Sequence, residues 1–374
     1  MSDEKETFPE TFDAPNGNPG NDPATKLLRE APLAEGKDLL LIEGGNGQLA
    51  SHFAPRFKNS VNHNTWYPDH FDAGELLKKS APSVHCLLSD IPQADAPGGM
   101  PSGSFDAILF RLARGTATLN AVLCESFRLL RIGGVFWVSG HNKEGIKSFV
   151  KRSEAHFGNA NLARIKSSCR LVGFKKESER PVNPVEDPHY FEYQDLEINI
   201  PRLGNIAYSS KPGIFSYRTT DLGTALLAKF LPDCAGKTVL DLGCGSGVLS
   251  VAAGKAGAAS VLAVDANAIA TQCTVRNFER HSLPGKVLCT HLTEGLDTEF
   301  DIVLSNPPFH QGHATDYSLP GKILDAIIPR LKTGGSIYLV ANRFLDYAAQ
   351  GATRFQKVEV LAREQGYCVY RMDR

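Results

Sequence analysis

The chain has 374 residues, of which 42% are hydrophobic and 22% charged, and its formal net charge at pH 7 is -1. This balance is typical of a globular protein and excludes a collagen-like or wholly disordered chain. The length favours two domains. The charge excludes a strongly basic surface over the whole molecule, so that any binding of RNA phosphates requires a local patch.

Residues 1–25 are rich in Asp, Glu, Pro, Gly and Asn and contain no apolar segment, which predicts a disordered tail and not a signal peptide. No run of 18 apolar residues occurs, so the sequence predicts no membrane span. The eight cysteines form no Cys-x-x-Cys pair and have no His at zinc-ligand spacing. We therefore expect a cytoplasmic protein with reduced thiols and no metal.

Two stretches of the chain follow one pattern. Residues 238–252 read as a short apolar strand, a glycine-rich turn and the start of a helix, and residues 39–53 read the same way. Two later pairs of segments match in the same order: 105–110 with 300–305, and 130–138 with 331–339. These matches favour a duplicated domain, although any two α/β units share such a pattern. Both interpretations predict an α/β fold.

The second half alternates strands with helices, which predicts a parallel sheet covered by helices on both faces. The predicted elements are strands 238–242, 260–264, 286–290, 301–305 and 335–341, helices from 247, at 267–280 and at 319–332, and a closing hairpin of 357–362 with 367–371. Prolines crowd the stretch 181–188, as expected for a linker. We place the boundary near residue 182, which gives domains 26–182 and 183–374.

A glycine-rich turn follows the strand at 238–242. It reads Asp241-Leu-Gly243-Cys244-Gly245-Ser-Gly247 and lies where open α/β sheets bind ligands. Such a turn also serves dinucleotides, whose phosphates bind at helix amino termini. The charge of Asp241 would repel a pyrophosphate but would help to hold the positively charged methionine part of S-adenosylmethionine. The turn therefore predicts S-adenosylmethionine as the cofactor.

Asp265 ends the next strand, 24 residues after the first acid of the turn, which suits hydrogen bonds to both ribose hydroxyls of an adenosine. The alternative is that Asp265 caps the helix that begins after Ala266. No acid follows the third strand, where one commonly contacts adenine. His291 lies there instead, and it either approaches the adenine or is an ordinary surface or core histidine.

The segment Asn306-Pro307-Pro308-Phe309 follows the fourth predicted strand. An amino group on an aromatic base is a poor nucleophile because its lone pair is delocalised into the ring. The carbonyl oxygens of Asn306 and Pro307 can accept both amino hydrogens and so direct the lone pair at the sulfonium methyl, while the paired prolines stiffen the loop. Phe309 offers a face for a base taken out of its helix. The alternative is plain turn chemistry.

Three segments give the chain a resemblance to a known family: 213–216 with 221–223, then 241–247, then 306–310. They resemble the bacterial ribosomal RNA guanine-N2 methyltransferases, of the small-subunit type or the closely similar large-subunit type. The resemblance implies two tandem Rossmann-like class I methyltransferase domains, the first degenerate and the second catalytic. It also implies that the substrate is ribosomal RNA or a ribosomal subunit, and we expect a monomer.

In that family the segment before the cofactor strand covers the cofactor and helps to form the base pocket. The resemblance thus implies substrate contacts for Phe215, Ser216, Arg218, Asp221, Phe309 and His310. The family commonly has Arg directly after its Phe-Ser pair, whereas here Arg218 stands two residues beyond Ser216. His310 and His313 have no acidic or Cys partner nearby, so we expect them at the substrate mouth or in solvent.

The first half lacks the residues that the predicted methyl transfer needs. Leu41 stands in place of Asp241, Glu43 in place of Gly243, and 110–114 in place of the Asn-Pro-Pro-Phe segment. We therefore expect this half to bind RNA or to support folding. A set of its basic residues either forms a phosphate-binding face or is merely solvated: Arg111, Arg114, Arg128, Arg131, Lys147, Lys151 and Arg152.

Two other functions remain open at this point. Related tetrapeptides serve methyltransferases that act on DNA adenine or on protein glutamine. A noncatalytic ribosome-assembly factor could also retain this fold, although the intact Asp241, Asp265 and Asn306 favour an enzyme.

Overall fold

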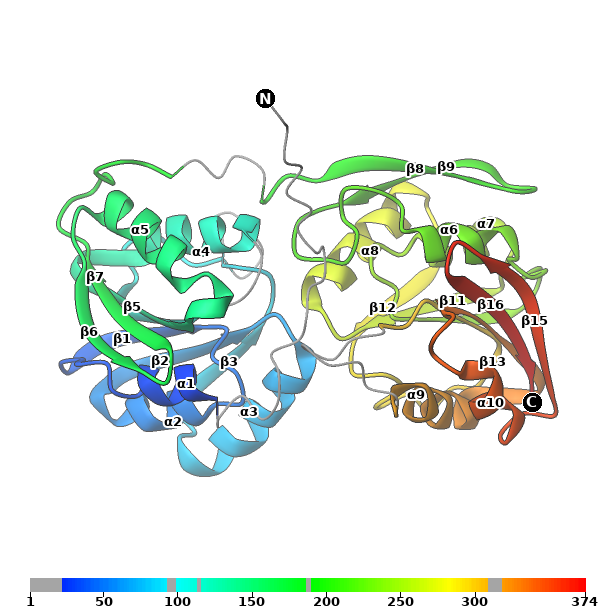
Figure 1. Ribbon diagram of the computed structural model, residues 1–374, viewed down its shortest axis with the longest axis horizontal. Coiled ribbons are helices and arrows are strands. Elements are labelled where there is room, and N and C mark those ends of the chain that lie inside the picture. The colour runs from blue at the N-terminus through cyan, green and yellow to red at the C-terminus, as the bar shows by residue number, and fades with distance from the viewer. Residues whose placement is uncertain (1–21, 93–98, 113–115, 186–189, 309–317) are drawn as a thin grey trace.

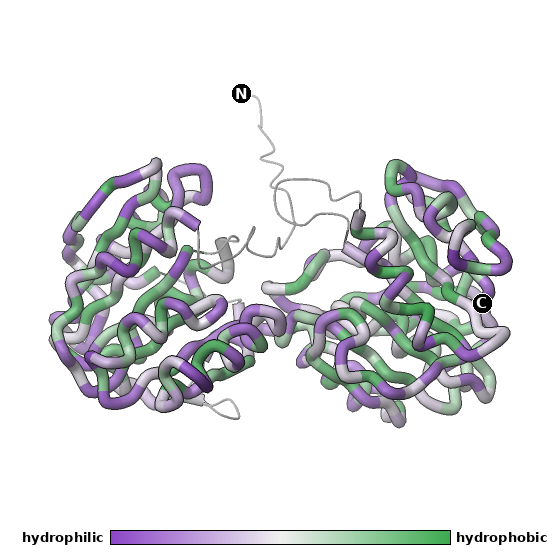
Figure 2. Tube along the Cα trace, turned by 90° about the horizontal axis from the view of Figure 1, so that it is seen from below, coloured by the Kyte–Doolittle hydropathy of each residue, from purple (hydrophilic) through white to green (hydrophobic). Residues whose placement is uncertain are grey.

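The computed structural model describes residues 22–92, 99–112, 116–185, 190–308 and 318–374. Two α/β bodies lie side by side along the long axis of the molecule (Figure 1). Hydrophobic stretches of the chain run through the interior of each body, and hydrophilic stretches lie mostly at its outside (Figure 2). No helix among the described ranges is long and apolar enough to cross a membrane.

The first body contains a seven-stranded sheet of order β3-β2-β1-β4-β5-β7-β6. Its strands are β1 Gly36–Ile42, β2 Phe57–Asn64, β3 Val84–Leu88, β4 Phe105–Arg111, β5 Leu130–His141, β6 Asn161–Lys166 and β7 Cys169–Lys175. Its helices are α1 Pro23–Leu28, α2 Gln48–Phe53, η1 Ala54–Arg56, α3 Tyr67–Ser80, α4 Thr116–Leu129, η2 Asn142–Glu144 and α5 Ile146–Phe157.

The second body repeats this order as β12-β11-β10-β13-β14-β16-β15. Its strands are β10 Thr238–Leu242, β11 Ser260–Asp265, β12 Gly285–Cys289, β13 Phe300–Ser305, β14 Leu331–Asn342, β15 Lys357–Glu364 and β16 Tyr367–Asp373. Its helices are α6 Leu222–Lys229, α7 Val248–Lys255, α8 Ala268–Arg280, α9 Leu319–Ile327, η3 Ile328–Arg330 and α10 Tyr347–Ala352. The matching orders confirm the predicted pair of tandem methyltransferase-like domains.

Most elements of the second half lie where the sequence predicts them. The helix predicted at 319–332 is wrong in length, because α9 ends at Ile327 and a 3-10 turn containing Pro329 leads directly into β14. The hairpin of β8 Gln194–Ile200 and β9 Gly204–Ser210, which forms a separate two-stranded sheet, was not predicted from the sequence. Its inward residues Ile198, Ile206 and Tyr208 share a hydrophobic core with residues of α6 and α7, and the hairpin contacts α6 and α8.

Strand register makes the two copies directly comparable. In the first sheet Ile42 pairs with Phe110, and in the second Leu242 pairs with Ser305. The next residues along β4 and β13 are Arg111 and Asn306, which therefore occupy equivalent positions. The degenerate copy thus carries an arginine where the other copy carries the predicted catalytic asparagine.

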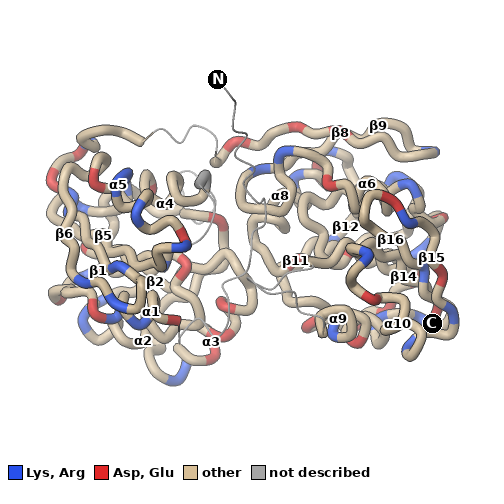
Figure 3. The backbone as a smooth tube through the Cα atoms, viewed as in Figure 1, with Lys and Arg blue, Asp and Glu red and all other residues tan. Residues whose placement is uncertain are grey.

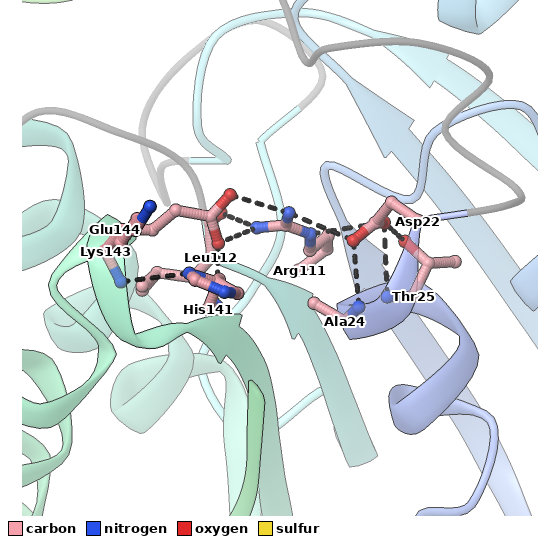
Figure 4. A network of polar contacts seen from close by, with 8 residues as sticks. All are labelled: Asp22, Ala24, Thr25, Arg111, Leu112, His141, Lys143 and Glu144. Atoms are coloured by element: carbon pink, nitrogen blue, oxygen red, sulfur yellow. Dashed lines mark hydrogen bonds and ion pairs between the residues drawn. The ribbon is translucent and has the colours of Figure 1, made fainter. Parts of the chain in front are cut away.

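Arg111 is held in an ion-pair network (Figure 4). Its guanidinium donates to Glu144 through two nitrogens, at 2.8 Å each, and lies 3.1 Å from Asp22 Oδ1. Asp22 in turn caps α1 by accepting from the backbone of Ala24 at 2.9 Å. Helix α1 starts at Pro23, inside the segment predicted as tail, and residues 1–21 lie outside the described residues.

Two further arginines of the predicted phosphate face are also paired. Arg128 contacts Glu125, and Arg131 bridges Asp38 and Asp106 at 2.7 and 2.8 Å. Charges of both signs alternate over both bodies in the view of Figure 3. Acidic side chains therefore already pair with Arg111, Arg128 and Arg131, which argues against a phosphate-binding face at these three positions. For Lys147, Lys151 and Arg152 the face stays a prediction, and Arg114 lies outside the described residues.

Equivalent loops of the two copies pair with each other. The loop between β2 and α3 forms an antiparallel bridge with the loop between β11 and α8, joining Trp66 to Asn267. Tyr67 N–H donates to the Ala266 carbonyl at 2.8 Å, and Ala268 N–H donates to the Thr65 carbonyl at 2.9 Å. Because a segment here pairs with its own counterpart, the two copies are related by an approximate two-fold rotation.

A buried ion pair fastens the two bodies beside this bridge. Lys211, which follows β9, contacts Asp90 of the first body, and the two side chains are only 2% and 8% exposed. Tyr190 donates its hydroxyl to the same carboxylate at 2.9 Å. The ammonium also lies 4.7 Å from the Tyr190 ring centre and 5.4 Å from that of Phe191. The charge of Lys211 is thus compensated by an anion and by aromatic faces.

The segment after the predicted boundary at residue 182 keeps contact with the first body. Asn183 N–H donates to the Ala155 carbonyl at 3.1 Å, and Val185 N–H donates to His156 Nδ1 at 3.0 Å. Tyr190 and its neighbour Phe191 belong to the first hydrophobic core.

Lys211→Met is expected to lower the free energy of unfolding by about 3 kcal/mol, because it leaves the Asp90 carboxylate buried without its cation. Adding Asp90→Asn to that variant should recover part of the loss, since the buried charge is then removed. Urea unfolding of the wild type, both single variants and the double variant measures the coupling. Additive effects of the two substitutions would contradict a stabilising pair.

Candidate active site

A cavity of about 590 Å³ opens at the carboxyl ends of β10, β11 and β13. Ligands bind at this edge in open α/β sheets, and the volume lies within the usual range for ligand pockets. Its wall contains predicted site residues from three sheet-edge loops and from the segment before α6: Phe215, Ser216, Asp221, Gly243, Cys244, Gly245, Asp265, Ala266, His291, Asn306, Pro307 and Pro308.

The glycine turn needs glycine for two different reasons. Gly243 and Gly245 have φ of 74° and 57°, and a β-carbon added to either would project into open space. Gly247, at φ 77°, is absent from the cavity wall, and a β-carbon there would lie 2.7 Å from Thr274 of α8. The first two glycines shape the floor of the cavity, whereas Gly247 allows α7 and α8 to pack closely.

Asp265 lies on the cavity wall at the end of β11. Its two oxygens accept the backbone N–H groups of Gly245 and Asn267, each at 2.9 Å. Burial raises the pKa of this carboxyl. The cap of α8 is Asn267, whose side chain accepts from Ile269 N–H at 2.9 Å, so the alternative of Asp265 as helix cap is wrong. A carboxylate has further lone pairs, so Asp265 can still accept two ribose hydroxyls.

Asp241 lies beneath the glycine turn and not on the wall. It is 1% exposed, and its Oδ2 accepts from both the backbone and the hydroxyl of Ser250 in α7, at 3.0 and 2.5 Å. Its Oδ1 has no hydrogen-bond partner among the described atoms. Burial raises the pKa of Asp241 to about 6. In this conformation Asp241 therefore does not face the cavity, where it was expected to contact the methionine part of the cofactor. Its side chain instead anchors the first turn of α7.

Asn306 is held in one orientation by two acceptors. Its Nδ2 donates to Asp221 Oδ2 at 2.8 Å and to Thr224 Oγ1 at 2.9 Å. A carboxylate can only accept hydrogen bonds, so the NH2 group must face Asp221. The carbonyl oxygen of Asn306 is then the atom left for a ligand. Asp221 also caps α6, accepting from the backbone N–H of Thr224 at 2.8 Å.

The prolines stiffen the loop beside this amide. Pro307 is buried, Pro308 is exposed, and both contribute to the cavity wall. Ser305 at the end of β13 donates its hydroxyl to the Leu242 carbonyl at 2.8 Å and so ties this loop to β10. The predicted Phe309, His310 and His313 lie outside the described residues.

The segment before α6 covers one side of the cavity. Phe215 is 45% exposed although it belongs to the wall, and Ser216 has φ 52° and donates to the Thr219 carbonyl at 2.8 Å. Arg218 is exposed, is absent from the wall and lies with its guanidinium 5.2 Å from the ring centre of Tyr217. Arg218 therefore does not line the cavity, and its contact with the substrate stays a prediction.

Sequence reasoning missed several residues of the wall: Trp66, Pro68, Tyr208, Thr224, Lys322 and Tyr367. Thr224 could have been found, because it lies three residues after Asp221, and Asp is a residue type typical of helix caps. Trp66 and Pro68 carry no such signal, since they belong to the degenerate copy and reach the cavity only through the packing of the two bodies.

The chain is similar to several known methyltransferases. The model of the methyltransferase small domain matches residues 205–371. The ribosomal RNA small subunit methyltransferase C of Pseudoalteromonas atlantica is 31% identical over 92% of this chain and 96% of its own length. That of Acinetobacter baumannii is 28% identical, with the same two coverages. A T. thermophilus 16S rRNA N2 methyltransferase, solved with AdoMet and guanosine, superimposes with a TM-score of 0.80 at 24% identity, covering 95% of this chain and 92% of that one.

A glycine turn, a carboxylate on the second strand and an oriented Asn-Pro-Pro segment on this sheet define an S-adenosylmethionine-dependent methyltransferase. The likeness to the solved structure extends to both bodies and so confirms the tandem fold. The chain belongs to the ribosomal RNA small subunit methyltransferase C family.

Asp221→Ala is expected to lower kcat by roughly 10-fold to 100-fold, because the Asn306 amide loses the acceptor that fixes its orientation. Asp221→Asn should recover most of the rate, since its carbonyl oxygen can accept from both Asn306 and Thr224. Steady-state methylation assays on both variants measure this difference. Equal rates for the two variants would show that Asp221 does not orient the amide.

Asp241→Asn is expected to stabilise the protein above pH 6 by about 1 to 3 kcal/mol. Because burial raises the pKa of Asp241 from 3.8 to about 6, the folded state binds this proton more tightly than the unfolded state does. The wild type therefore loses stability as the pH rises through that interval, and the variant does not. Urea unfolding of both proteins between pH 3.5 and pH 7.5, in steps of about half a unit, measures this effect. The difference in the free energy of unfolding between variant and wild type should grow up to about pH 6. A difference that stays constant over this range would contradict a raised pKa of Asp241.

Proposed function

We propose that the carboxyl-terminal domain transfers a methyl group from S-adenosylmethionine to the exocyclic amino nitrogen of a guanine in small-subunit ribosomal RNA. The observation that carries the proposal is the orientation of the Asn306 amide, whose oxygen is left free by the contacts of its nitrogen with Asp221 and Thr224. Membership of the small subunit methyltransferase C family supports the same substrate.

The residues present fit the proposed cofactor. Asp265 would accept the ribose hydroxyls, and the backbone at Gly243 and Gly245 would border the methionine part. Ala266 and His291 belong to the wall near Asp265, where the adenine would lie. When bound, S-adenosylmethionine supplies an electrophilic methyl group on a sulfonium.

The protein's own contribution to the reaction is positioning. The Asn306 oxygen and the backbone carbonyl of Pro307 accept the two hydrogens of the guanine amino group, which directs the nitrogen lone pair out of conjugation with the ring. Methylation makes the nitrogen acidic, so its surplus proton can leave to water and no strong base is required. The apolar surfaces of Phe215 and Pro308 would contact the base.

The amino-terminal copy, residues 26–182, has a different task in this proposal. Arg111 occupies the position of Asn306 and is neutralised by Asp22 and Glu144, and Leu41 occupies the position of Asp241. This copy therefore has an arginine where the other has the amide that orients a substrate amine. We assign to it the task of supporting the catalytic copy, residues 183–374.

We also propose that the enzyme acts as a cytoplasmic monomer. Ribosomal RNA, the proposed substrate, is found in the bacterial cytoplasm.

Purified protein, incubated with methyl-labelled S-adenosylmethionine and small ribosomal subunits or 16S rRNA, should yield labelled N2-methylguanosine. Asn306→Ala is expected to lower the rate by about 100-fold or more, because the amine loses one of its two acceptors, while cofactor affinity is retained. Asn199→Ala, at an exposed position of β8, is the matched control and should keep the wild-type rate.

Two results would contradict the proposed function. Label confined to large-subunit RNA, to DNA adenine or to protein glutamine would replace the substrate named here. An unchanged rate for Asn306→Ala would remove the proposed chemistry even if the substrate were right.

A further inference from the structure

We propose that Trp66, a residue of the degenerate amino-terminal copy, forms part of the adenosine end of the cofactor site in the other copy. This inference rests on the proposed function, because it takes S-adenosylmethionine as the ligand of the cavity. It gives the degenerate copy a defined part in cofactor binding in addition to support of the fold.

The backbone pairing between the copies brings Trp66 to the cavity. Its bridge to Asn267 is flanked by the hydrogen bonds Tyr67 N–H to Ala266 O and Ala268 N–H to Thr65 O. Asn267 lies only two residues beyond Asp265, the predicted ribose acceptor. Trp66 and Pro68 are both part of the cavity wall. The two halves of the protein therefore meet directly beside the place where the ribose would bind.

Among the described residues, Trp66 belongs to neither hydrophobic core of its own domain. Trp66 occupies the N-cap position of α3, but its side chain makes no capping hydrogen bond. The equivalent residue of the other copy, Asn267, caps α8 and also donates to the Gly213 carbonyl at 2.8 Å. A tryptophan thus replaces a capping residue, remains half-buried and contributes to a cavity that belongs to the other domain.

The position of Trp66 along the sheet edge favours adenosine over the RNA base. Trp66 lies beside the end of β11, whereas Asn306 follows β13, and β10 lies between these two strands. Neighbouring strands are about 4.8 Å apart, so the two strand ends are separated by roughly 10 Å. An amine bound to Asn306 is therefore on the far side of the glycine turn from Trp66, and the adenosine end is the near side.

The chemistry of the neighbouring groups agrees with this assignment. Asp265 can accept hydroxyl groups, and Ala266, Leu292 and Val264 offer apolar surface on the same part of the wall. An indole adds a flat aromatic face, on which a purine ring can stack. Polar recognition of the ribose thus comes from the catalytic copy, and aromatic contact comes from the degenerate one.

The test compares Trp66→Ala with Trp66→Phe in the full-length protein. Calorimetry with S-adenosylhomocysteine is expected to show a Kd raised about 10-fold in Trp66→Ala, and within about 3-fold of the wild type in Trp66→Phe, which keeps an aromatic face. Adenosine alone should lose affinity by a similar factor. The KM for RNA should keep its wild-type value in both variants, and circular dichroism with thermal unfolding verifies that both are folded.

Fluorescence gives a second readout that a purely structural role would not change. The chain has two tryptophans, and the other, Trp137, is 5% exposed and belongs to a second hydrophobic core of the amino-terminal body, around Leu39 and Phe53. Adenosine should therefore quench the emission of the wild type through Trp66. In Trp66→Phe the same addition should leave the emission unchanged.

The outcomes separate this inference from the proposed function. If the wild type binds neither S-adenosylmethionine nor S-adenosylhomocysteine, the proposed function itself fails. If the wild type binds them and a folded Trp66→Ala binds them equally tightly, the role of Trp66 is overturned. A raised KM for RNA with an unchanged cofactor Kd would assign Trp66 to the substrate instead and would likewise overturn the inference.

Discussion

The hydrogen bond from Asn306 to Asp221 is the interaction on which the proposed chemistry of this site depends. An asparagine amide can face either way, and only one orientation leaves an acceptor for a substrate amine. Asp221 removes the ambiguity because a carboxylate accepts and cannot donate, and Thr224 holds the second hydrogen of the same nitrogen. Since Asp221 also caps α6, the orientation of the amide is coupled to the position of a whole helix.

The two copies show how one fold gains and loses a site without a change of topology. At equivalent edges of the sheet, one copy presents Asn306 to a cavity, whereas the other holds the half-buried guanidinium of Arg111 between two carboxylates. A similar exchange occurs in the glycine turn, where the carboxylate of Glu43 accepts from the hydroxyl of Thr65 at 2.7 Å. In the first copy, polar groups that could meet a ligand are thus paired with one another.

The contact between the copies uses backbone and charge together. The bridge between Trp66 and Asn267 aligns the two loops, and the pair of Lys211 with Asp90 fixes them through groups that are nearly excluded from water. An unpaired charge in that position would be strongly unfavourable, so the interface has a preferred geometry. The same geometry brings a side chain of the degenerate copy to the wall of the catalytic cavity.

The sequence by itself determined the fold of each half and most of the cavity wall. Alternating strands and helices predict a parallel sheet, and the carboxyl ends of its strands meet at one edge, so Gly243, Asp265 and Asn306 had to converge. Only the tertiary structure decided the rest. Whether Asp241 points into the cavity or beneath α7 depends on side-chain packing, and whether Arg111 binds phosphate or Glu144 depends on a partner 33 residues away. Trp66 reaches the active site through contacts between domains, and a local pattern in one strand or helix carries no information about such contacts.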